Sequence, residues 1–188
     1  MRWQRQALRD CAPQPWRNGG GITHEMATWP TEGDWRWRVS VARIDRDGPF
    51  SAFEGVQRWF AVLQGEGVEL SWPDRRLRLG PRDAPATFAG APACAARLLG
   101  GPTLDFNLMA RGLRGTLQRQ QVTGVQVPWP AHAHVGVLAC TDCRWTAAHA
   151  PQTLKAREFA WTLTPELTPW HWQQGEALIF VLQEEMPR

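Results

Sequence analysis

The sequence predicts an all-β protein built from two β-barrel or β-sandwich halves that pack as one compact unit. Fifteen prolines and 17 glycines interrupt the 188 residues at short intervals, which favours strands and turns over helices. Residues 35–44 alternate like a half-buried strand, with Trp37 and Val39 on one face and Arg38 and Ser40 on the other. A third observation, a weak internal repeat, indicates that one β unit occurs twice.

Further strands are expected in the first half of the chain. Residues 58–64 are apolar on both faces, as in a strand enclosed by a sandwich or barrel. The small residues at 65–67 predict a turn after it. Residues 104–109 alternate again, so that Asp105 and Asn107 share one face.

The internal repeat predicts two halves. In each half a hydrophobic strand runs into a turn of small residues, and a strand that begins with glycine comes later. Two pairs of segments carry this likeness: 61–67 with 135–140, and 80–88 with 175–180. We place the seam near residues 112–120, which gives an N-terminal half of residues 1–115 and a C-terminal half of residues 116–188.

Composition and charge exclude several classes of partner. The formal net charge is only +3, Lys155 is the only lysine, and the arginines are spread along the chain, so we expect no nucleic-acid binding. The chain lacks both a signal-peptide pattern and a run of about 18 apolar residues, so we expect a soluble, cytoplasmic protein that binds no membrane. Its four cysteines are then expected to be free thiols.

The most unusual segment is Pro15–Glu25, which contains three consecutive glycines. Glycines in a row mark a backbone that needs positive φ or close approach, and their amides can form an anion-binding nest. The alternative is a flexible loop. The segment is neither a phosphate-binding loop nor a dinucleotide-binding turn, because the Lys-Ser/Thr and the strand-helix context are missing. Polar or aromatic side chains flank the glycines: Trp16, Asn18, Thr23 and Glu25.

This segment resembles the opening motif of the HutD/Ves family. The resemblance continues in order along the chain, through residues 37–42, 47–53, Arg58, 63–67, 88–90, 101–102 and 105–109. It spans roughly residues 13–111, while the chain from about 115 on carries little that matches. Arg17 stands where the family often has lysine. The resemblance implies a single-chain bicupin, associated with histidine utilisation and thought to sense or buffer an intermediate such as urocanate, without an established enzymatic activity.

Many cupins hold a metal through a His-x-His pair followed by a glutamate and a further histidine. Residues 58–67 contain no histidine. In the second half, His132 and His134 form an i, i+2 pair without a glutamate at that spacing, and Cys140 and Cys143 have the spacing of a zinc knuckle. A structural zinc at these four residues stays an open alternative, but the sequence favours a protein without metal or other cofactor.

The polar residues of the N-terminal half predict a ligand site. Arg58 opens an apolar strand, and a charge there needs a partner. We expect Arg58 to bind a ligand carboxylate through two hydrogen bonds. The alternative is that Arg58 pairs with Asp105 inside the barrel, with no ligand. The predicted ligand-binding residues are Trp16, Asn18, Gly20, Thr23, Glu25, Arg38, Ser40, Arg58, Asp105 and Asn107.

The resulting hypothesis is a non-enzymatic, small-molecule-binding cupin. It would bind a small anionic metabolite such as urocanate or formylglutamate and regulate histidine utilisation. The alternative is a metal-dependent cupin enzyme of the isomerase or dioxygenase type. No nucleophile, base and acid occur in a recognisable order, so we assign no catalytic residue. The ligand's identity, the protein partners and the choice between monomer and homodimer stay open.

Overall fold

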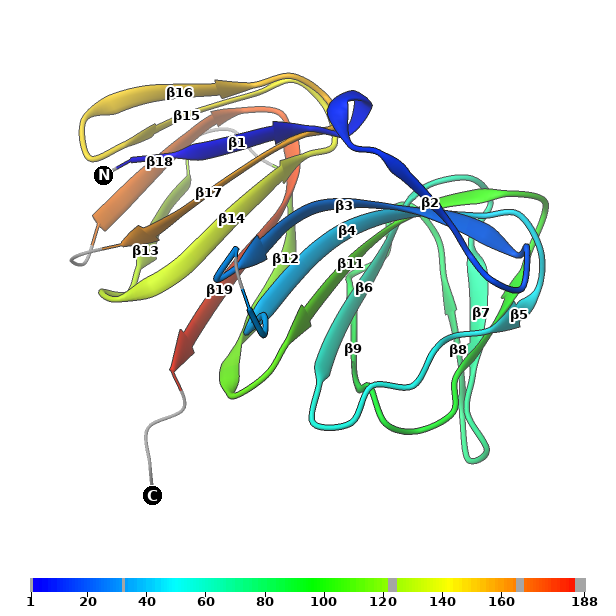
Figure 1. Ribbon diagram of the computed structural model, residues 1–188. Coiled ribbons are helices and arrows are strands. Elements are labelled where there is room, and N and C mark those ends of the chain that lie inside the picture. Colours follow the sequence, from blue (N-terminus) through cyan, green and yellow to red (C-terminus); the bar gives the residue numbers. More distant parts are fainter. Residues whose placement is uncertain (1, 32, 122–124, 165–167, 185–188) are drawn as a thin grey trace. The chain divides into compact units, whose positions relative to one another are not determined.

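The computed structural model describes residues 2–184, apart from residues 32, 122–124 and 165–167. The described regular structure consists of β-strands and one 3-10 turn, η1 (Leu8–Asp10), so the all-β prediction is confirmed. Within these residues no helix has the length and apolar character needed to cross a membrane. The chain divides into two units (Figure 1): a first unit, Cys11–Gly112, and a second unit formed by the chain before and after it.

The first unit contains two antiparallel sheets. The larger has six strands in the order β2 (Pro13–Pro15), β3 (Gly21–Trp29), β4 (Trp37–Ile44), β11 (Thr103–Ala110), β6 (Gln57–Gln64) and β9 (Ala86–Ala89). The smaller has four strands in the order β5 (Gly48–Pro49), β10 (Ala95–Leu98), β7 (Val68–Ser71) and β8 (Arg76–Leu79).

The interior of the first unit lies between these sheets, which face each other in Figure 1. Phe60 and Val62 from β6 pack in one cluster with Val68 and Leu70 from β7, and all four are at most 1% exposed. Strand β6 is buried from Arg58 to Leu63, as its unbroken apolar run predicts. Burial of both faces therefore explains why this strand does not alternate.

The second unit also contains two antiparallel sheets. One has five strands in the order β1 (Gln4–Ala7), β17 (Glu158–Thr164), β14 (Ala133–Ala139), β19 (Glu176–Glu184) and β12 (Leu113–Gln121). The other has four strands in the order β13 (Val125–Trp129), β18 (Thr168–Gln174), β15 (Cys143–Ala147) and β16 (Ala150–Leu154). Its core is rich in tryptophan: the ring of Trp145 stacks on Trp170 and Trp172, with centroids 5.9 and 5.3 Å apart.

The two units repeat one topology. The order β4-β11-β6-β9 in the first unit corresponds strand by strand to β12-β19-β14-β17 in the second, and β5-β10-β7-β8 corresponds to β13-β18-β15-β16. The predicted likeness of residues 61–67 to 135–140 agrees with this scheme, since β6 corresponds to β14. The predicted correspondence of residues 80–88 with 175–180 is wrong. The first range contains most of β9, which corresponds to β17, and the second lies almost entirely in β19, which corresponds to β11.

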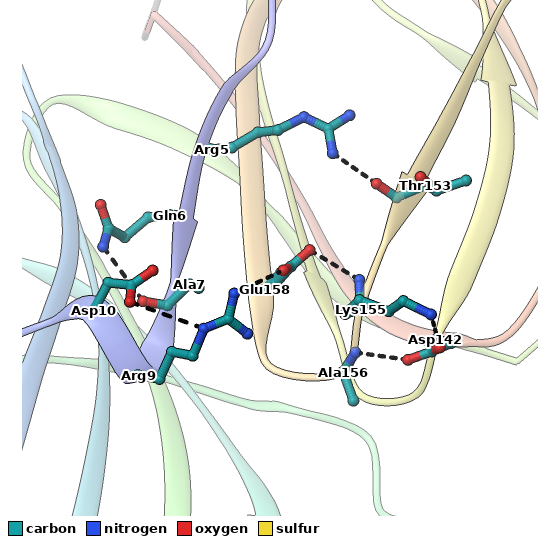
Figure 2. Close-up of polar contacts among 10 residues, drawn as sticks. All are labelled: Arg5, Gln6, Ala7, Arg9, Asp10, Asp142, Thr153, Lys155, Ala156 and Glu158. Carbon is teal, nitrogen blue, oxygen red and sulfur yellow. Dashed lines mark hydrogen bonds and ion pairs between the residues drawn. The ribbon is translucent and has the colours of Figure 1, made fainter.

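The first ten residues belong to the second unit, whereas the sequence suggested one division at 115/116. Strand β1 adds to the sheet edge beside β17 (Figure 1), with Gln4 opposite Trp161 and Ala7 opposite Glu158. Figure 2 shows a polar contact that joins β1 to β16 of the same unit: Arg5 Nη1 donates to the Thr153 carbonyl at 2.6 Å. The seam itself falls between Gly112 and Leu113.

Candidate functional site

A cavity of about 740 Å³ lies within the first unit. Strand β4 supplies one wall, because period-two alternation turns Arg38, Ser40, Ala42 and Ile44 to the same face. The other walls come from β3, β6, β11, the turn before β3 and the segment that follows β5. Seven of the predicted ligand-binding residues line the cavity: Trp16, Asn18, Thr23, Arg38, Ser40, Arg58 and Asn107.

Arg58 is the buried cation of this cavity, with 5% of its surface exposed. Its Nη2 donates to Asn107 Oδ1 at 3.0 Å, its Nη1 makes a long contact of 3.5 Å to the Ser51 carbonyl, and its Nε has no described hydrogen-bond partner. The guanidinium carbon lies 5.0 Å from the ring centroid of Phe50 and 5.3 Å from that of Phe88. Aromatic faces therefore stabilise a cation that has been removed from water.

Arg58 stays charged in this setting. Burial lowers the pKa of Arg58 from its ordinary value to about 10; Cys94 opposes this effect, and the positive charge of Arg38 adds to it. A guanidinium has five N–H donors, and the two contacts above use two of them. No carboxylate among the described residues pairs with it. The alternative in which Arg58 pairs with Asp105 is therefore wrong for this structure.

Asp105 lies in the same interior but is not among the residues that line the cavity. It is fully buried and sits on the same face of β11 as Asn107, directly across from Ala42 on β4. The Thr103 hydroxyl donates to its Oδ2 at 2.6 Å, and its Oδ1 has no described partner. Burial raises the pKa of Asp105 from 3.8 to about 7, against the smaller opposing effect of the Thr103 hydrogen bond. The expected role of Asp105 as a cavity residue is therefore corrected.

Glu25 also lies outside the cavity, where it pairs with Arg38, a residue that lines the cavity. Its Oε2 lies 2.9 Å from Arg38 Nε. The geometry does not meet that of a hydrogen bond, so the contact is an ion pair. A β-bulge between Glu25 and Ala27 follows this position in β3. Glu25 thus compensates the charge of Arg38 instead of reading the ligand as expected.

The glycine segment is a closed hairpin turn, not a flexible loop. The Trp16 amide donates to Gly21 O at 2.9 Å, and Gly19 N donates to Trp16 O at 3.0 Å. The Gly20 amide donates to Asn18 Oδ1 at 3.0 Å and does not line the cavity. The prediction that Gly20 offers its amide to a ligand is therefore wrong. The turn instead positions Trp16, whose Nε1 donates to Thr23 Oγ1 at 2.8 Å.

Sequence reasoning missed the segment that follows β5. Phe50 and Phe53 line the cavity and lie over the Arg58 guanidinium, and Ser51 accepts its long hydrogen bond. These three residues lie within residues 47–53, which resemble the HutD/Ves family. That resemblance is the sequence feature from which their place at the site could have been predicted. Arg17 and Met109 also line the cavity.

The candidate zinc residues of the second unit do not assemble. In the described part of the chain, no three His, Cys, Asp or Glu side chains are grouped closely enough to hold a metal ion. His132 precedes β14 with φ of 53°, and His134 lies within that strand. Cys143 Sγ donates to the carbonyls of Thr141 and Glu176.

The fold and cavity define the class: an all-β bicupin with a buried arginine in the interior of its first unit. The chain belongs to the HutD family, whose model matches residues 8–180.

Two relatives and one solved structure carry this likeness over different lengths. Protein Ves of Cronobacter sakazakii is 30% identical over 171 residues, which cover 90% of this chain and 87% of that protein. A Pseudomonas putida protein described by its place in the hutC 3′ region is 44% identical over 113 residues, which cover 56% of this chain and only 58% of that protein. The structure of HutD from Pseudomonas fluorescens SBW25 has a TM-score of 0.86 at 26% identity, covering 98% of this chain and all of the other.

A more distant structure supports the fold alone. A cupin 2 conserved barrel domain protein from Leptotrichia buccalis has a TM-score of 0.60 at 10% identity, covering 97% of this chain and 96% of the other. The predicted bicupin fold is confirmed.

Proposed function

We propose that the first unit binds a small organic anion through Arg58, and that this binding serves regulation in histidine utilisation. Urocanate and formylglutamate are our examples of such a small carboxylate. The observation that carries the proposal is a buried guanidinium that lines a cavity without a carboxylate partner among the described residues.

Physical reasoning supports a carboxylate as the missing partner. A buried charge is costly unless it is paired, and removing either partner of such a pair is strongly destabilising. The donors left on Arg58 match a carboxylate in charge and geometry. Ser40 and Asn107 lie opposite each other in register on the neighbouring strands β4 and β11, and they add hydrogen-bonding groups beside that cation.

The regulatory part of the proposal draws on the relatives. The family takes its name from HutD, and the Pseudomonas putida relative is described by its position beside hutC. Binding without turnover suits a protein that reports or limits the level of a pathway acid.

Isothermal titration calorimetry with urocanate and with formylglutamate tests this function. We expect saturable binding of at least one acid to the natural protein. Arg58→Gln should weaken it by about 30-fold or more, since truncating one partner of a buried charge pair costs about 2–5 kcal/mol. Arg43→Gln is the matched control, because Arg43 lies on β4, is exposed and pairs with Asp45 at 2.8 Å.

The control and a thermal melt separate lost binding from lost folding. Arg43→Gln should bind like the natural protein, and Arg58→Gln should keep a cooperative melting transition. The function is refuted if neither acid binds the natural protein, or if folded Arg58→Gln binds as tightly as the control.

A further inference from the structure

The cavity of the first unit carries more positive charge than the described residues neutralise. Three arginines line it at different depths: Arg58 is buried, Arg38 is half-buried and Arg17 is exposed. No aspartate or glutamate is among the described residues of its wall. Glu25 compensates Arg38 from outside the cavity at 2.9 Å. Arg58 and Arg17 remain without an ion pair to any residue that the structure describes.

Arg17 is carried on a fixed part of the backbone. It follows Trp16, whose amide donates to Gly21 O and whose carbonyl accepts from Gly19 N. The turn is thus closed on both sides of Arg17. A side chain presented from an ordered turn loses less conformational entropy on binding than one on a loop that must first order.

The Phe50 ring contacts both Trp16, which precedes Arg17 at the rim, and the buried Arg58. The rings of Trp16 and Phe50 meet edge to face with centroids 6.3 Å apart, and the guanidinium carbon of Arg58 lies 5.0 Å from the same Phe50 ring. The turn that bears Arg17 therefore lies one aromatic ring away from the Arg58 site. The cavity volume of about 740 Å³ exceeds what a small organic acid fills.

We infer that the cavity selects dianions, with one carboxylate of a short dicarboxylate at Arg58 and the second read by Arg17 at the rim. This inference rests on the proposed function and deepens it, because it assigns the substrate class and a residue that determines specificity. Two uncompensated cations that line one cavity favour two anionic groups on one ligand. A monoanion of the same shape leaves Arg17 without a partner.

The expected selectivity is modest, because Arg17 is exposed. An ion pair at a solvent-exposed position contributes about 1 kcal/mol at most, which corresponds to about five-fold in affinity. Salt screens such a contact, so the preference should shrink as ionic strength rises from about 0.01 M to about 0.15 M. The buried contact at Arg58 is screened much less and should keep most of its strength.

Calorimetry with glutarate and with its monoamide tests the inference. The two acids have nearly the same shape and differ by one negative charge. We expect the natural protein to bind glutarate about five-fold more tightly than the monoamide at low ionic strength. Arg17→Gln should bring the ratio to about one while leaving the affinity for the monoamide unchanged, and Arg17→Lys should restore the preference. Arg43→Gln, which alters an exposed arginine outside the cavity wall, should keep it.

The outcomes distinguish this inference from the function on which it rests. Equal binding of both acids by the natural protein, or a preference that survives in Arg17→Gln, overturns the dianion inference. In that case, loss of monoamide binding in Arg58→Gln still supports the proposed function. If neither glutarate nor its monoamide binds the natural protein at millimolar concentration, the dianion inference fails, whereas the proposed function fails only if urocanate and formylglutamate do not bind either.

Discussion

Asp105→Asn removes a carboxyl group from the interior of the first unit without changing its shape. Asp105 is fully buried, accepts one hydrogen bond from Thr103 at 2.6 Å, and has a second oxygen without a described partner. The asparagine oxygen can accept the same hydrogen bond. Its amide cannot ionise, so the substitution isolates the cost of holding a charge at this position.

The sign of the effect follows from the raised pKa. Burial raises the pKa of Asp105 from 3.8 to about 7, so the folded protein holds the proton more tightly than the unfolded chain does. The contribution of Asp105 to the free energy of unfolding is therefore most favourable below pH 3.8. It falls as the pH rises from 3.8 to about 7 and does not change at higher pH. The difference between the two pKa values corresponds to roughly 4 kcal/mol in the free energy of unfolding. Because relaxation and water penetration soften such penalties, we expect a gain of about 2–4 kcal/mol for Asp105→Asn near pH 8.5.

Urea unfolding at several pH values measures this difference. The gain should shrink to within about 0.5 kcal/mol near pH 4, where the natural carboxyl is protonated in the folded protein and about half protonated in the unfolded chain. Asp74→Asn, in the exposed turn between β7 and β8, is the control and should change stability by less than about 0.5 kcal/mol at either pH. A stability difference between Asp105→Asn and the natural protein that does not depend on pH would refute the reasoning.

Two further predictions concern the backbone and the core. Gly67 has φ of +110°, and an added Cβ would meet the Leu79 carbonyl, so Gly67→Ala should destabilise by about 2 kcal/mol or more in urea unfolding. Gly33→Ala, with φ of +77° but open space, should cost only about 1 kcal/mol, and equal effects would contradict the steric argument. Trp145→Ala should cost about 3–5 kcal/mol because Trp145 is fully buried in the second unit, whereas half-buried Trp161→Ala should cost clearly less by the same assay.

Much of the fold could be predicted because period-two patterns report burial directly. The alternation of residues 37–44 appears in β4, and the apolar run of residues 58–64 appears in β6. The pairing of β1 with β17 could not be predicted, because the contact joins residues about 150 positions apart and β1 has no strong alternation. The false second repeat arose because short apolar strands resemble one another without sharing a place in the sheet.

The candidate site could be predicted in part for a related reason. Alternation places Ser40 and Arg38 on one face of β4, and β11 brings Asn107 beside Ser40. The same rule places Asp105 on the same face as Asn107, but tertiary packing decides which residues of that face reach the cavity, so the absence of Asp105 from the cavity lining could not be derived. The Gly20 amide likewise has the exposed backbone that a nest needs, yet the Asn18 side chain occupies it.

A crystal structure of the protein grown with formylglutamate or urocanate tests the central claim most directly. We expect a ligand carboxylate in the cavity of the first unit, with an oxygen at about 2.7–2.9 Å from a guanidinium nitrogen of Arg58. An ordered acid bound elsewhere, with Arg58 still contacting only Asn107 and Ser51, would contradict it.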